Sequence, residues 1–161
     1  MYASFPNWSP GLGGKSTIWR VPIDGGQAIQ LSDALGSEPK ASPDGRWIGF
    51  LYFPGDDPQY ARRALALIDK DGGPPVKTFG NLPTFSYDIA FAPDSRAIDF
   101  GAVTQGVGNL WRQPLDGGAP YPVTHFNIGQ TYDMAWSMDG RQLAIARGKT
   151  TRNVVLMTNF K

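Results

Sequence analysis

Three acidic residues recur along this chain at nearly constant spacing: Glu38, Asp88 and Asp133, separated by 50 and 45 residues. Tyr87 and Tyr132 directly precede two of them and would add aromatic contact area. Carboxylates gathered around one axis repel one another, which raises their pKa values or attracts a cation or a basic group. We therefore expect these five residues to form a ligand-binding mouth for a cationic peptide segment or a metal ion. The alternative is that each acid only caps a local turn.

The rest of the chain offers little for catalysis or for cofactors. His125 is the only histidine and there is no cysteine, which excludes disulfides, thiolate zinc sites and cysteine catalysis. A catalytic triad or a multi-histidine metal site would depend on His125 alone, so we assign that residue a loop-packing role. We predict no catalytic residue, no resident metal and no cofactor.

The stretch 9–16 superficially resembles a phosphate-binding loop. It has Ser9 where such a loop needs its first glycine, and β-forming residues follow it instead of a helix. Backbone amides would then not converge as they do at a helix N-terminus. We expect this stretch to be a solvent loop.

The three acids follow a repeat of the whole chain. Each stands four residues before a turn of the type Ser-Pro-Asp-Gly-Arg, and the equivalent turn positions are Ser42, Ala92 and Ser137. A second motif, Asp-Gly-Gly, recurs in phase with it at steps of 47 and 45 residues. A period of this length, with room for four short strands, is typical of a propeller blade. The aspartates of the first motif, predicted to close the turns by accepting amide hydrogen bonds, are Asp44, Asp94 and Asp139.

The predicted fold is all-β, a β-propeller of four-stranded antiparallel blades. Within each unit the strands run a to d, with the first motif joining a to b and the second joining c to d. The boundaries are 1–31 for strands b-c-d of one blade, 38–78 and 87–124 for two full blades, and 132–158 for strands a-b-c of the last. These amount to about three and a half blades, which cannot close into a ring. We expect either the C-terminal piece of a longer propeller or copies that self-associate through the open ends.

The repeated turns, each followed by an apolar strand, resemble the PD40 or TolB-like β-propeller repeat, a relative of WD40. The segments 109–118, 123–126, 135–141 and 154–157 resemble the C-terminal end of bacterial multi-repeat proteins of this type, which are often fused to a serine/threonine kinase or a winged-helix domain. Met138 replaces the proline of the repeat, and Ser95 replaces its glycine. The resemblance implies protein or peptide ligands, and kinase-fused forms imply a periplasmic or extracytoplasmic location.

Charge and hydropathy narrow the choice of partners. The net charge is +1 and only 18% of residues are charged, which gives no electrostatic footprint for nucleic acid or an anionic membrane. No apolar run approaches the ~20 residues of a membrane helix, and the first residues lack the pattern of a signal peptide.

The predicted function is a non-catalytic ligand- or protein-binding or sensor module of a larger bacterial signalling protein. Two alternatives stay open: a propeller hydrolase, glycosidase- or peptidase-associated, and a purely structural scaffold. Against catalysis, acids at one equivalent position are symmetric, whereas a general acid and a general base need unequal environments.

Overall fold

The structure, a computed structural model, describes residues 2–4, 16–55, 63–80, 82, 83, 85–149 and 151, with side chains left out at 2–4 and 85–87. All regular elements in these ranges are strands, arranged in four antiparallel sheets. No helix that could span a membrane occurs in the described part of the chain. The all-β class and the partial propeller predicted from the repeats are confirmed.

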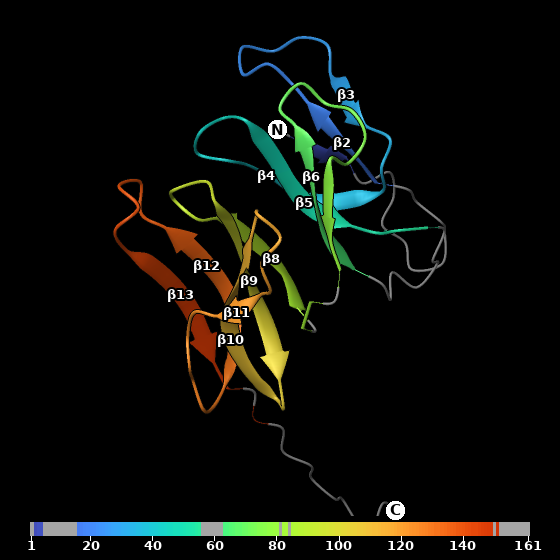
Figure 1. Ribbon diagram of the computed structural model, residues 1–161. Coiled ribbons are helices and arrows are strands. Elements are labelled where there is room, and N and C mark those ends of the chain that lie inside the picture. The colour runs from blue at the N-terminus through green and yellow to red at the C-terminus, as the bar shows by residue number, and fades with distance from the viewer. Residues whose placement is uncertain are drawn as a thin grey trace, which may run out of the picture.

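The four sheets follow the chain in order and fan out side by side (Figure 1). The first holds β1 (Tyr2–Ser4), β2 (Thr17–Arg20) and β3 (Ile29–Ser32). The second holds β4 (Gly36–Ala41), β5 (Trp47–Tyr52), β6 (Ala64–Asp69) and β7 (Lys77–Phe79). The third holds β8 (Phe85–Phe91), β9 (Ala97–Thr104), β10 (Val107–Pro114) and β11 (Tyr121–Pro122). The fourth holds β12 (Gln130–Trp136) and β13 (Leu143–Gly148).

Strand bounds differ slightly from the sequence-based ones. The second sheet starts at Gly36, because this residue takes part in the ladder and packs so closely on Phe50 that a Cβ would lie 2.3 Å from its ring. The stretch expected as strand c of the last blade, around 153–157, lies outside the described residues, as does the loop 9–15.

Two apolar layers lie between consecutive sheets. Alternate residues of β5 point to opposite faces, so that Ile48 and Phe50 pack toward the first sheet and Leu51 toward the third. Strands covered on both faces read as continuous apolar runs, and β6 does so. Position 49 needs a glycine because side chains of the third sheet pack directly against its backbone. A Cβ at Gly49 would lie only 2.8 Å from Ile98 Cδ1. Each sheet therefore buries its sides mainly against its neighbours.

The predicted turn aspartates lie in three equivalent tight turns. Asp44 accepts hydrogen bonds from Ser42 Oγ (2.5 Å) and the Arg46 amide (3.1 Å), and Asp139 makes the same pair of contacts. The hydroxyl and backbone hydrogen bonds lower the pKa of both carboxyls. Asp94 accepts the amide hydrogen of Arg96 at 3.0 Å.

Ser95 takes over the glycine position of its turn with a left-handed backbone, φ 59°. Its hydroxyl accepts the backbone N–H of Asp44 at 3.0 Å, from the equivalent turn of the preceding sheet. The substitution therefore keeps the turn geometry and adds a contact between two sheets, which offsets the usual cost of a side chain at positive φ.

Candidate functional site

The first strands of successive sheets lie next to one another: β4 contacts β8, and β8 contacts β12. The three acids predicted as a binding mouth sit on these strands, one on each. We call the group formed by Glu38, Lys40, Asp88 and Asp133 the inner rim. Figure 1 shows β4, β8 and β12 along the line where the sheets converge.

Each acid coincides with an irregularity in its strand. The pairing register shifts between Ser37 and Lys40 in β4, between Phe85 and Ile89 in β8, and between Thr131 and Asp133 in β12. Such bulges redirect side chains out of the regular alternation and are frequent beside functional sites. Glu38 also has a left-handed backbone, φ 54°, which is unusual for a glutamate. The acids thus lie in bulged strands and not in turns.

Asp88 and Asp133 are brought together across the seam between the third and fourth sheets. The Met134 amide donates to Asp88 Oδ2 at 2.9 Å and to Asp133 Oδ1 at 2.8 Å, so one N–H joins both carboxylates. Burial of Asp88, the Asp133 hydrogen bond and the Asp133 charge raise the pKa of Asp88 to about 6, against the lowering effect of the Met134 amide and Lys40. One carboxyl is half-buried and the other exposed, so their environments are unequal.

Glu38 stands apart from this pair. No hydrogen bond or ion pair joins it to Asp88 or Asp133 in the described part of the chain, and the charge from β4 that acts on Asp88 is that of Lys40. The structure therefore brings two of the three acids together and adds a lysine that sequence spacing did not single out. The side chain of Tyr87 lies outside the described residues, and the exposed ring of Tyr132 lies over Gly148.

No group of three or more His, Cys, Asp or Glu residues suited to a metal ion occurs within the described ranges. His125 is exposed on the loop after β11. That loop is held by Asn109, whose Oδ1 accepts the Phe126 amide at 2.7 Å and whose Nδ2 donates to the Phe126 carbonyl at 3.2 Å.

The sequence analysis missed a buried ion pair between β9 and β10. Asp99 is 1% exposed and accepts two hydrogen bonds from Arg112, at 2.7 and 2.9 Å, and one from Trp136 Nε1, at 3.1 Å. The Asp99 hydrogen bond is the main reason that the pKa of Arg112 is raised. A signal existed in the sequence, because Asp99 is the one charge in the apolar run of β9.

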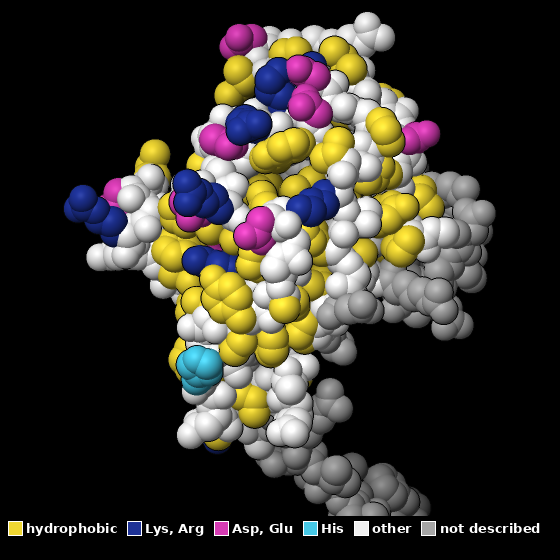
Figure 2. All heavy atoms as spheres, in the orientation of Figure 1, with side chains coloured by type: hydrophobic (Ala, Val, Ile, Leu, Met, Phe, Trp, Pro, Cys, Tyr) yellow, Lys and Arg dark blue, Asp and Glu magenta, His cyan; other side chains and the backbone are white. Residues whose placement is uncertain are grey.

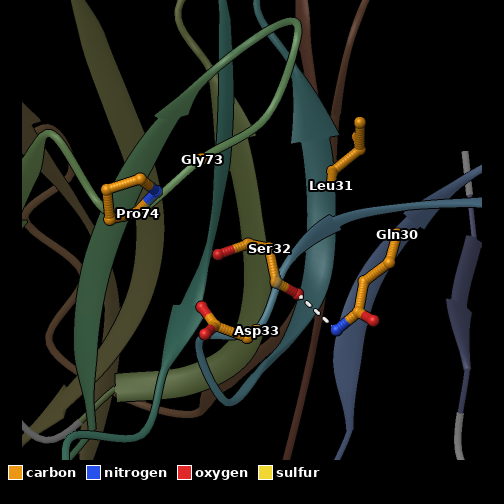
Figure 3. A pocket seen from close by; sticks show the side chains of 6 residues that line it. All are labelled: Gln30, Leu31, Ser32, Asp33, Gly73 and Pro74. Carbon is orange, nitrogen blue, oxygen red and sulfur yellow. Dashed lines mark hydrogen bonds between the residues drawn. The ribbon is translucent and has the colours of Figure 1, made fainter.

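A shallow hollow of about 290 Å³ lies between β3 and the turn before β7 (Figure 3). Ser32 and Asp33 point toward Gly73 and Pro74 there, and the Gln30 side-chain amide donates to the Ser32 carbonyl at 3.2 Å. The face in Figure 2 carries acidic and basic side chains interspersed among apolar ones, without a patch of one sign.

Comparison with solved structures shows which known proteins share this fold. No protein-family profile matches the chain. A structure described as a putative TolB from Agrobacterium tumefaciens superposes with a TM-score of 0.61 at 22% identity, over 90% of this chain and 57% of that one. TolB from Acinetobacter baumannii superposes with a TM-score of 0.56 at 19% identity, over 83% of this chain and 33% of that one. The chain has the fold of TolB-like β-propellers.

Two curated proteins are similar to the chain in sequence. An uncharacterized protein of Agrobacterium fabrum is 25% identical over 155 residues, which cover 90% of this chain and 50% of the relative. Dipeptidyl-peptidase 5 of Porphyromonas gingivalis is 30% identical over 119 residues, which cover 70% of this chain and 17% of the peptidase. The chain thus spans half the length of the first relative and a much smaller part of the second.

Proposed function

We propose that the chain is a non-catalytic binding module that recognises a basic peptide or protein segment at its inner rim. The observation that carries this is the juxtaposition of Asp88 and Asp133 on adjacent innermost strands. Two carboxyl groups at such a short separation destabilise each other when both are ionised. A lysine or arginine from a partner would therefore relieve their repulsion. Fold similarity alone cannot supply this function, because propellers host many activities.

Exposure supports this assignment. Asp133 and Tyr132 are both exposed on β12, Tyr132 at 54%. A side chain of a partner could therefore reach the carboxylate without rearrangement of the strand. A guanidinium suits such an exposed carboxylate, because its planar fork can donate two hydrogen bonds to it.

The experiment compares capture of a lysine- and arginine-rich peptide library with capture of a glycine- and serine-rich one. We expect the protein to retain the basic peptides, and the triple variant Glu38→Asn, Asp88→Asn, Asp133→Asn to lose most of that binding. The control is Asp33→Asn, which removes one exposed acid elsewhere on the surface. Equal retention by the triple variant and the unaltered protein would refute the proposal.

A hydrolase is the second candidate, supported by the partial similarity to a protein named as a peptidase. The unequal environments of Asp88 and Asp133 remove the objection from symmetry. Glycoside hydrolysis is nevertheless disfavoured, because it needs carboxyls ~5 to ~9.5 Å apart with room for the sugar between them, whereas the single Met134 amide donates to both of these. Incubation with peptide and glycan libraries, followed by mass spectrometry, would reveal any cleavage. A purely structural scaffold would show neither binding nor cleavage.

We also propose, from the resemblance of the repeats, that the module belongs to a larger bacterial signalling protein and works outside the cytoplasm. The chain's coverage of only half of its Agrobacterium relative supports the first part. Cell fractionation with an antibody against the chain tests both points, through the size of the detected protein and its compartment.

A further inference from the structure

The chain contains five Asp-Gly pairs, at Asp24, Asp44, Asp71, Asp116 and Asp139. At such a pair the glycine nitrogen can attack Cγ of the aspartate, since no glycine side chain obstructs the approach. The N–Cγ bond forms, the Cγ–OH bond breaks, and water leaves with the amide proton. Water then opens the succinimide. Cleavage at the original peptide carbonyl leaves isoaspartate, in which the backbone runs through Cβ and Cγ.

Four of the five aspartate carboxyls are restrained by hydrogen bonds or ion pairs. Asp44 and Asp139 each accept a serine hydroxyl and a backbone amide. Asp116 Oδ1 accepts the Gly118 amide at 2.8 Å. Asp71 pairs with Lys70 and lies 3.9 Å from Arg20. Each of these contacts must break before the carboxyl carbon can meet the following nitrogen.

The same four turns are also covered by a neighbouring sheet. In the turn after Asp71, the amide of Gly73 donates a hydrogen bond to the carbonyl of Leu31 at 2.7 Å. Lys77 donates to the carbonyl of Leu115 beside Asp116. In the turn of Asp44, the Asp44 amide donates to Ser95 Oγ. The turn of Asp139 packs on Pro93, whose Cβ would lie only 2.6 Å from a Cβ placed at Gly140. In each case the cover comes from the adjacent repeat.

Asp24 has neither a restrained carboxyl nor a contact from a neighbouring sheet within the described residues. Within the described residues its carboxyl accepts no hydrogen bond and joins no ion pair, and residues 22–30 are exposed, Ile23 completely. A Cβ would meet nothing within 4 Å at Gly25 or at Gly45, so the unrestrained carboxyl of Asp24, and not the space at the glycine, sets this pair apart from that of Asp44. The Gly25 amide donates to Pro22 at 3.2 Å, much as Gly72 and Gly117 donate in their own turns, so the amide itself does not distinguish the pair.

We propose that Asp24–Gly25 is the site at which this protein spontaneously forms isoaspartate, well ahead of its four other Asp-Gly pairs. The change inserts one backbone carbon into the turn between β2 and β3.

The test incubates the intact chain at neutral pH and elevated temperature below its unfolding transition. Trypsin digestion and electron-transfer fragmentation then separate isoaspartate from aspartate in each peptide. Because a hydrogen bond to a charged group must be given up at the other sites, we expect Asp24 to convert about tenfold faster than any of them. Isoaspartyl methyltransferase labelling gives a second readout.

Two comparisons make the result decisive. In urea the five pairs should convert at similar rates, because unfolding removes both the hydrogen bonds within the turns and the contacts between the sheets. Asp24→Glu keeps the charge but disfavours the five-membered ring, and should remove most of the methyl label. Faster or equal conversion at another pair in the folded chain, no conversion at Asp24, or the same ranking in urea would each overturn the proposal.

Discussion

The indole Nε1 of Trp136 donates a hydrogen bond to the buried carboxylate of Asp99, 3.1 Å away, across the seam between the third and fourth sheets. The guanidinium of Arg112 also binds Asp99 and lies 6.0 Å from the centre of the Trp136 ring. This charge network thus fastens the same seam at which Asp88 and Asp133 meet, whereas the seams between the earlier sheets are filled mainly by apolar side chains.

Asp99→Asn should lower the free energy of unfolding by about 2–3 kcal/mol, because it leaves the Arg112 charge largely buried without its partner. Urea denaturation monitored by tryptophan fluorescence measures the loss. Asp33→Asn makes the same chemical change on the surface and should stay within about 0.5 kcal/mol. A loss for Asp99→Asn as small as the control's would show that the network contributes no stability.

Stability should fall as pH rises from about 4 toward about 6 on account of Asp88. Its pKa lies at about 6 in the folded chain against an ordinary value of 3.8, so the folded state binds more protons in that window and loses stability on deprotonation. Asp88→Asn should flatten this slope and raise stability at neutral pH, since it still accepts the Met134 amide. Denaturation midpoints across this pH range test it, and an unchanged slope in the variant would contradict it.

Removing the carboxyl of Asp133 should lower the pKa of Asp88, because Asp133 raises it through both a hydrogen bond and its charge. Asp133→Asn keeps the size of the side chain and removes that charge. Carbon-detected NMR titration of the Asp88 carboxyl follows the change directly. Burial remains in the variant, so we expect a partial return toward the ordinary range, and no movement at all would show that the carboxyls do not interact.

Ser95→Ala should destabilise the protein by about 1 kcal/mol, because the alanine keeps the left-handed backbone but loses the hydrogen bond to the Asp44 amide. Ser95→Gly loses the same bond while relieving the strain at φ 59°, so it should lie closer to neutral. Thermal or urea unfolding of the two variants side by side gives the comparison. The reverse order would mean that backbone strain is negligible here.

Gly49→Val should cost about 2 kcal/mol by overpacking the layer between the second and third sheets, where Ile98 and Phe91 already touch this position. Ala144 is the equivalent residue of the fourth sheet and is exposed. Ala144→Val should therefore change stability by less than about 0.5 kcal/mol. Similar losses at both positions would indicate that the exposed face of the fourth sheet is also packed.

The architecture can be predicted from the repeated motifs alone. Repeated turn motifs at steps near 45 to 50 residues define strands and their order, because aspartate and glycine close tight turns by local hydrogen bonding and φ preference. The same logic located Asp44, Asp94 and Asp139 in their turns, and placed Glu38, Asp88 and Asp133 on the first strands.

Which of those acids meet depends on how neighbouring sheets pack. All three lie in irregular stretches of their strands, but only Asp88 and Asp133 share the Met134 amide across the seam between the third and fourth sheets. The pairing of Asp99 with Arg112 and Trp136, and the hydroxyl contact of Ser95, likewise depend on how neighbouring sheets stack. Contacts between repeats are set by the packing of whole sheets, so spacing along the chain predicts the sheets but not the polar pairs that join them.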